Sequence, residues 1–187
     1  MATTARLLTY GDLLALPDDG KRYEIIDGEL LEMPSPSLPH QDILGRLFGL
    51  LLNFLERTDL GRVFPAPLDI RLSTHNIVQP DLVVFRKERL HLLGPMPVDV
   101  VPDLAIEILS PSSREHDEQQ KFQRYAAAGI PEYYLADLDI RALRGYTLRD
   151  GVYEPLPQDG SILRSRILPG LEFDLSVLFA NLIGDNR

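Results

Sequence analysis

The sequence predicts an α/β domain with a mixed central β-sheet, flanked by helices and preceded by an N-terminal hairpin. Apolar residues recur at three- and four-residue steps through residues 40–57, as on a helix with one buried face. Residues 78–85, 103–109 and 132–136 form short apolar runs with the length and composition of buried strands. An Asp-Gly pair at positions 27–28 separates two more strand-like runs, which is the strongest local signal for a β-hairpin.

The composition is that of one globular domain, which we expect to span residues 1–187. Hydrophobic residues make up 44% of the chain and charged residues 25%, which excludes a disordered protein. No run approaches the roughly 20 apolar residues of a membrane span, and the first residues lack the apolar core of a secretory signal. We therefore expect a cytoplasmic protein with no membrane partner.

Charge and cysteine content narrow the kinds of site that the chain can carry. The formal net charge of −9 argues against tight, indiscriminate binding to nucleic acid, which depends on lysine and arginine. It does not exclude a nuclease, because bound divalent ions supply positive charge. The absence of cysteine excludes disulfides and thiolate metal ligands, which leaves oxygen and histidine ligands.

The remaining elements of the N-terminal half follow from turn and proline signals. A short helix over residues 10–16 precedes the hairpin of residues 22–33, and a proline-rich connector leads to the main helix. Residues 63–72 are expected to form one strand, with two prolines favouring an edge or a bulge at its start. Residues 78–85 form the next strand, and prolines and a glycine predict a loop over residues 86–102.

The C-terminal half is expected to begin with a helix capped by Ser112 or Ser113. This helix runs to Ala128 and stops at Gly129, a residue suited to the left-handed position after a helix. A second hairpin, over residues 144–155, turns at another Asp-Gly pair. The apolar closing segment, residues 168–178, either covers the sheet or supplies an interface.

Asp81 and Glu107 are the strongest candidates for a functional site. Each lies in or beside an apolar strand-like run, where an isolated carboxylate is costly unless it is paired, protonated or bound to metal. For Asp81 the ordinary alternatives are a turn cap or a pair with an arginine. For Glu107 the alternative is a buried ion pair with Arg114 or Lys121.

Lys121 can reach the same place as the two acids. It shares one face of the predicted helix with residues 114, 118 and 125, and this helix folds back after the strand that carries Glu107. Two acids and a lysine at the end of a sheet suggest metal-assisted cleavage of a phosphodiester. The ordinary alternative for Lys121 is a solvated surface group.

Four stretches of the chain carry a resemblance to a known family. They read YEIIDGEL (23–30), QPDLVV (79–84), EILSPSS (107–113) and KFQRYAAAGIPEYY (121–134). Each stretch is short, but the combination is specific and resembles the Uma-two family of endonucleases. That family lies within the restriction-endonuclease-like PD-(D/E)XK superfamily, so the resemblance implies a restriction-endonuclease-like core.

The resemblance implies an endonuclease that hydrolyses phosphodiester bonds in DNA and forms a homodimer. It further implies that Asp81, Glu107 and the backbone carbonyl of Ile108 hold Mg²⁺, with Mn²⁺ as a substitute. Lys121 would orient or help deprotonate the attacking water, or neutralise charge developing on phosphorus. Glu24 matches a glutamate of the family pattern and is either a fourth participant or an exposed residue of an alternating strand.

The chain departs from the superfamily motif at one position. In the motif a lysine follows the acid by two residues on the same strand, and here that position is Leu109. The resemblance implies that the lysine has moved to the helix, as Lys121. The alternative is a weak or inactive nuclease-fold module that binds nucleic acid or protein, and a third possibility is hydrolysis of another phosphate ester.

Three more polar residues have ordinary explanations. Gln79 either points toward the site or is simply polar, and His40 fits the N-terminal turn of the main helix. Tyr125 is expected to pack beneath Lys121. The remaining histidines show no spacing suited to a zinc site.

Overall fold

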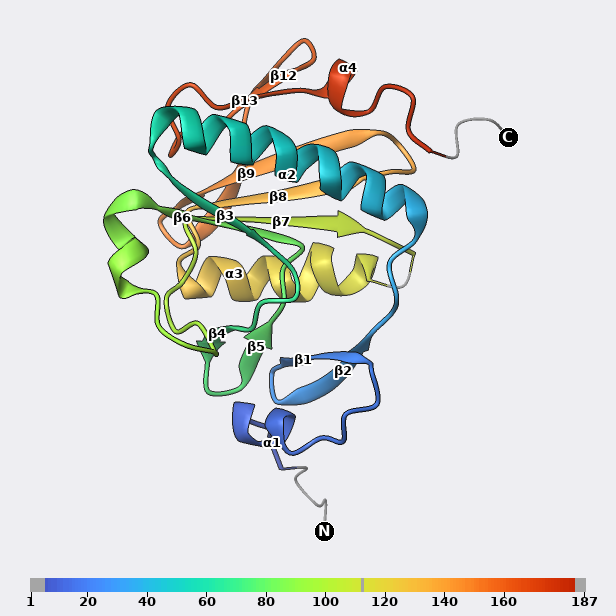
Figure 1. Cartoon of the computed structure of the whole chain (residues 1–187), viewed down its shortest axis with the longest axis vertical. Coiled ribbons are helices and arrows are strands. Elements are labelled where there is room, and N and C mark those ends of the chain that lie inside the picture. The colour runs from blue at the N-terminus through green and yellow to red at the C-terminus, as the bar shows by residue number, and fades with distance from the viewer. Residues whose placement is uncertain (1–5, 112, 184–187) are drawn as a thin grey trace.

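The computed structural model describes residues 6–111 and 113–183 and contains a mixed six-stranded sheet at its centre (Figure 1). Its strands, in spatial order, are β10 (Val152–Pro155), β9 (Ala142–Arg149), β8 (Glu132–Asp137), β7 (Leu104–Leu109), β6 (Leu82–Arg86) and β3 (Gly61–Pro65). The β7 and β8 strands are parallel, and the other neighbours are antiparallel. The predicted mixed sheet and the hairpin of β9 and β10 are therefore confirmed.

Two smaller sheets flank the central one. The four-stranded sheet has the order β2 (Glu29–Met33), β1 (Arg22–Ile26), β5 (Asn76–Val78) and β4 (Ile70–Ser73). The three-stranded sheet consists of β11 (Gln158–Asp159), β12 (Ile162–Arg164) and β13 (Glu172–Asp174). The predicted N-terminal hairpin is confirmed, because Asp27 and Gly28 have φ angles of 53° and 80°, as a two-residue hairpin turn of this type requires.

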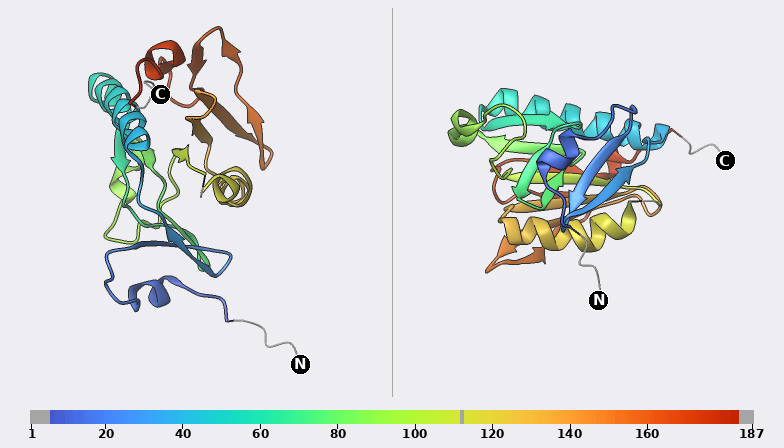
Figure 2. Two further views of the ribbon diagram at one scale, coloured as in Figure 1. Left: turned by 90° about the vertical axis from the view of Figure 1, so that its right-hand side faces the viewer. Right: turned by 90° about the horizontal axis from the view of Figure 1, so that it is seen from below.

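The helices are α1 (Tyr10–Leu14), α2 (Leu38–Thr58), α3 (Phe122–Ala128) and α4 (Leu175–Leu178), with a 3₁₀ helix η1 (Lys87–Leu92) and a π-helical segment η2 (His116–Lys121). The two main helices, α2 and α3, cover opposite faces of the six-stranded sheet (Figure 2). Side chains alternate between these faces, so Leu104 and Ile106 pack toward α2 whereas Ala105 and Leu109 pack toward α3. No described helix has both the length and the apolarity needed to cross a membrane.

The structure corrects two predicted strands. Residues 63–72 and 78–85 do not form one strand each, because the chain crosses between the central and the four-stranded sheet in both places. Prolines lie at the crossings, where a residue without an N–H cannot continue a hydrogen-bonded ladder. A hydrogen bond joins the two crossing segments, in which the Ala66 N–H donates to the Asp81 carbonyl at 3.0 Å. Asp81 consequently lies at a junction of the two sheets instead of within a strand.

Three further predictions can be compared with the structure. Residues 86–102 are not a loop throughout, since they contain η1. Helical structure begins at Arg114, and Gly129 ends α3 with a φ of 84°, as predicted. Ser112 lies outside the described residues, and the Ser113 hydroxyl accepts from the Ser110 N–H instead of a helix N–H.

The closing segment covers the sheet, which was one of its two predicted roles. Its apolar side chains Leu168, Leu171, Phe173 and Leu178 belong to the core beneath α2. The buried Glu132 of β8 anchors the approach to this segment by accepting from the N–H groups of Arg166 and Ile167, at 2.6 and 3.2 Å.

Candidate active site

Glu107 lies in a strand that is buried along its whole length, and its side chain is 3% exposed. Because strand side chains alternate, Glu107 projects to the same face as Ala105 and Leu109, toward α3 and η2. The crossover between the parallel strands β7 and β8 carries both of these helical segments over this face. The sheet thus determines where the Glu107 side chain lies. Whether its carboxyl group is ionised depends on the side chains of η2 and α3 that pack over it.

Lys121, at the end of η2, is the basic group that meets Glu107. Its Nζ lies 3.0 Å from Glu107 Oε1, 3.0 Å from Glu24 Oε2 and 3.3 Å from Asp117 Oδ1. Burial alone would lower the pKa of Lys121, but the three carboxylates outweigh it and hold the pKa well above its ordinary value. Lys121 is therefore a charged ammonium shared by three acids.

The cluster around Lys121 contains more carboxyl groups than ammonium groups. Burial raises the pKa of Glu107 well above its ordinary value, with Lys121 opposing the shift and Asp117, Asp81 and Glu24 adding to it. Burial likewise raises the pKa of Asp117. An arrangement that disfavours ionisation of its own carboxylates is stabilised by an added proton or an added cation.

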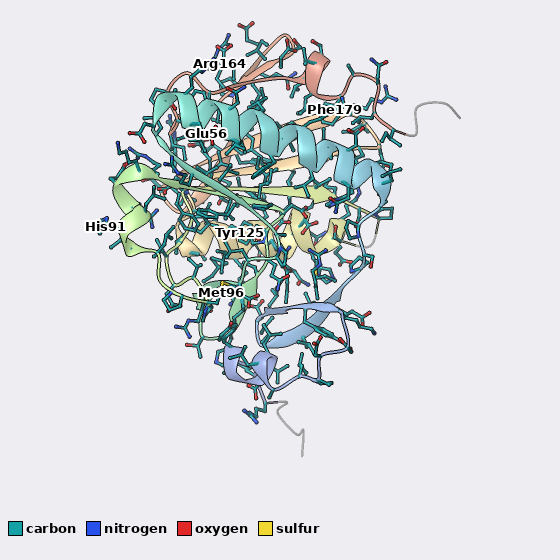
Figure 3. The ribbon with its side chains drawn as sticks, viewed as in Figure 1. Glu56, His91, Met96, Tyr125, Arg164 and Phe179 are labelled. Atoms are coloured by element: carbon teal, nitrogen blue, oxygen red, sulfur yellow. The ribbon has the colours of Figure 1, made fainter. Side chains whose placement is uncertain are left out.

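Tyr125, one helical turn beyond Lys121, contacts the same carboxylate oxygen. Its hydroxyl donates to Glu107 Oε1 at 2.6 Å, and burial raises the pKa of Tyr125 well above its ordinary value, so the hydroxyl keeps its proton. Figure 3 shows Tyr125 inside the molecule, and it is fully buried. It does more than pack beneath Lys121, because it also fixes the orientation of the Glu107 side chain.

Glu24 reaches the cluster from the N-terminal hairpin. It is completely buried on β1, so the possibility of an exposed strand residue is wrong. Its Oε1 accepts from the Gln79 N–H at 2.7 Å, and its Oε2 faces the Lys121 ammonium. The four-stranded sheet therefore contributes one acid to a cluster built mainly on the central sheet.

Asp81 is tied to Glu107 by reciprocal contacts between main chain and side chain. The Ile108 N–H donates to Asp81 Oδ2 at 2.8 Å, and the Asp81 N–H donates to Glu107 Oε2 at a longer 3.4 Å. His40, in the first turn of α2, has its Nε2 3.3 Å from Asp81 Oδ2. The two predicted acids, from β7 and from the junction before β6, are thus brought together.

A cavity of about 210 Å³ opens beside the two acids. Asp81, Glu107 and Asp117 line it, together with His40 and Ile108. Lys121 is not among the described lining residues and is only 1% exposed, so it lies behind Glu107 as seen from the cavity. The acids therefore lie at an accessible site with the lysine next to them, as the sequence suggested. The sequence did not indicate that Glu107 would separate the lysine from the cavity.

The donor set can be compared with the needs of a divalent cation. Within residues 6–111 and 113–183, no group of three or more His, Cys, Asp and Glu residues is arranged to hold a metal ion. Two carboxylates, from Asp81 and Glu107, face one cavity in a cluster with surplus negative charge. Such hard oxygen ligands fit Mg²⁺, which binds through one or two carboxylates and keeps several waters.

Three features of the site were not predicted from the sequence: the presence of Asp117, the contact of His40 with Asp81, and the hydrogen bond from the Tyr125 hydroxyl to Glu107. The spacing of Asp117 and Lys121 is a usable signal, since residues four apart on a helix are neighbours. Arg114 is not the partner of Glu107 and instead donates to Asp137 Oδ2 at 2.7 Å. The π-helical geometry of η2 is uncommon and is found preferentially at functional sites.

Comparison with known proteins identifies a family and a solved structure of the same fold. Residues 10–177 match the family model of Uma2, described as "Putative restriction endonuclease". A solved structure described as "a putative nuclease belonging to DUF820 from Anabaena variabilis ATCC 29413" matches with a TM-score of 0.76 and 21% identity, over 92% of this chain and 97% of that chain. This likeness confirms the restriction-endonuclease-like α/β fold. Comparison with curated proteins finds no match.

Proposed function

The chain belongs to the Uma2 family, and we propose on this basis that it is a metal-dependent endonuclease that hydrolyses phosphodiester bonds in DNA. One observation carries the proposal: the Asp81 and Glu107 carboxylates, 26 positions apart in the chain, line one cavity while a buried ammonium holds Glu107. Glu107, whose pKa burial raises, lines a cavity beside a second acid, and such an arrangement marks a candidate functional site.

Asp81 and Glu107 would hold the cation, Mg²⁺ or Mn²⁺, and the carbonyl of Ile108 would add a neutral oxygen ligand. When bound, the cation polarises a phosphoryl oxygen and lowers the pKa of a water molecule beside it. Asp81 is positioned for this role because the Ile108 N–H restrains its Oδ2. The same contact places Ile108 next to the acids that it would assist.

Lys121 would act through Glu107. Its ammonium and the Tyr125 hydroxyl both contact Glu107 Oε1, whereas Oε2 has only the long contact from the Asp81 N–H and can accept a ligand in the cavity. The positive charge of Lys121 also favours the ionised form of Glu107 that a cation requires. We accordingly assign Lys121 and Glu24 as positioning residues behind the two acids.

Cleavage of supercoiled plasmid with Mg²⁺ or Mn²⁺ tests the proposal. We expect Asp81→Asn and Glu107→Gln to lose about 100-fold or more in rate, the cost of disabling an essential catalytic group. Glu154→Gln is the matched control, because Glu154 is an exposed acid that pairs with Arg149. Equal cleavage by all four proteins would point to a contaminating nuclease and refute the proposal.

A second candidate function is a nuclease-fold module that binds without cutting. Two observations favour it. Leu109 occupies the strand position of the motif lysine, and Lys121 is buried and does not line the cavity. Binding of an oligonucleotide by the wild-type protein without cleavage under any divalent cation would support this reading. The homodimer, the cytoplasmic location and the single domain stay predictions, and sedimentation velocity would test the first.

A further inference from the structure

Of the described residues that line the cavity, Arg22 alone carries a permanent positive charge. It belongs to β1 and precedes Glu24 by two residues, so the two side chains project from the same face of the strand. Glu24 is completely buried against Lys121, whereas Arg22 is half-buried. One strand therefore supplies an acid to the interior of the site and a guanidinium to its wall.

Arg22 has no partner of its own within residues 6–111 and 113–183. Its side chain makes neither a hydrogen bond nor an ion pair there, although Asp81, Glu107 and Asp117 line the same cavity. The neighbouring Lys21, by contrast, pairs with Glu32 at 2.8 Å. None of the Arg22 guanidinium nitrogens is sealed from the cavity, so they are free to donate charge-assisted hydrogen bonds to a bound anion.

We propose that Arg22 binds a phosphate of the substrate next to the phosphate that is cut, an inference that rests on the proposed function. The acids and their cation would act on one phosphodiester group, and the guanidinium on the wall would take a neighbouring group of the same strand. Guanidinium suits this task because its planar fork matches phosphate oxygens. A substrate with several linked phosphates is thus favoured over a mononucleotide or another phosphate monoester.

The charge of the chain makes such a contact important. With a net charge of −9 and an acidic cavity, the protein repels a polyanion except where a cation meets it. Phosphate contacts by arginine position a nucleic acid without reading its sequence. Arg22 is therefore expected to affect substrate affinity and its salt dependence, and to leave the chemical step unchanged.

The experiment compares Arg22→Gln with Arg57→Gln on a fluorescent oligonucleotide cleaved in Mg²⁺. Arg57 is the matched control, because it is an exposed arginine on α2, outside this cavity, that also makes no hydrogen bond or ion pair within the described residues. We expect Arg22→Gln to raise KM about tenfold with kcat within about twofold, as loss of one charge-assisted contact to bound substrate implies. Arg57→Gln should match the wild type, and Arg22→Lys should recover part of the loss. Equal KM values for Arg22→Gln and Arg57→Gln would overturn the assignment.

A second measurement identifies the phosphate itself. Neutral methylphosphonates are placed one at a time along the oligonucleotide. At the phosphate that Arg22 contacts, the wild type should lose about tenfold in kcat/KM and Arg22→Gln should lose almost nothing, because the two changes remove one interaction. Losses that are additive at every position would contradict a direct contact.

The inference and the proposed function can fail separately. If the wild type cuts no substrate, the proposed reaction fails, and the same variants are compared by fluorescence anisotropy of the oligonucleotide. A Kd raised in Arg22→Gln alone, with a shallower dependence on salt, would then keep the assignment of Arg22. An equal Kd in all variants, or no binding at all, would refute it.

Discussion

Lys121 and Glu107 form an ion pair inside the protein, with Nζ 3.0 Å from Oε1 and both side chains almost completely buried. The pair joins the crossover helix to the strand that precedes it, and Glu24 and Asp117 share the same ammonium. Three carboxylates depend on one cation. Substitution of Lys121 or of its carboxylate partners is therefore expected to change both the stability of the fold and the properties of the site.

Removal of the shared ammonium should be severe. We expect Lys121→Met to lower the free energy of unfolding by about 3–5 kcal/mol, because it leaves buried carboxylates without a counter-ion. Urea denaturation measures the loss, and Lys21→Met, at an exposed pair, should leave the stability almost unchanged. Adding Glu24→Gln to Lys121→Met should recover part of the loss, and strict additivity would argue against the shared charge.

Removal of an acid should act in the opposite direction. In metal-free buffer at pH 8 we expect Glu107→Gln to be more stable than the wild type by about 1–2 kcal/mol, as found when a strained functional group is replaced. Lys121 keeps two acidic partners in this variant. Thermal denaturation with and without Mg²⁺ completes the measurement. Mg²⁺ should raise the Tm of the wild type alone, and an equal shift in both proteins would remove Glu107 from the metal site.

The hydroxyl of Tyr125 should influence the metal more than the fold. We expect Tyr125→Phe to weaken Mg²⁺ affinity about tenfold, since groups that orient a ligand typically contribute 10- to 100-fold. Tyr153→Phe is the control, because the Tyr153 hydroxyl is also buried but donates to the Ile130 carbonyl, away from Glu107. Isothermal titration with Mg²⁺ measures both variants. Equal affinities in the two would show that the Tyr125 hydroxyl is only a packing group.

Asp137 gives the fold a dependence on acid pH. Its hydrogen bonds from Arg114 lower its pKa below the ordinary 3.8, against the opposing effect of burial. A lowered folded pKa means that the stabilisation is present above the unfolded value and is lost as pH falls through the folded value. We expect Asp137→Asn to cost about 2 kcal/mol between about pH 5 and 8, a cost that shrinks below about pH 4.

Urea denaturation across that pH range checks the Asp137 prediction. Asp99→Asn is the matched control, because Asp99 also accepts two bonds from one arginine, Arg71, but in an exposed pair. Its cost should stay below about 1 kcal/mol. A cost for Asp137→Asn that does not change with pH would assign the effect to packing.

Local signals were sufficient for much of the fold. The Asp27-Gly28 turn, the apolar face of α2 and the Gly129 stop depend on residues close in sequence, and all three are confirmed. The strands predicted over residues 63–72 and 78–85 were wrong because the choice of sheet depends on distant partners. A proline signals an interrupted ladder, but not that the chain continues in another sheet.

Residue types and their spacing indicate where charge is costly: Asp81 and Glu107 lie in apolar surroundings, and Lys121 lies on a helix that returns toward them. How that charge is shared depends on tertiary packing, which buries Glu24 and Asp117 against the same ammonium and brings Arg22 to the cavity wall. This difference arises because burial and charge pairing depend on distances between segments far apart in the chain. Sequence periodicity assigns a side chain to a face, and packing decides which charges meet there.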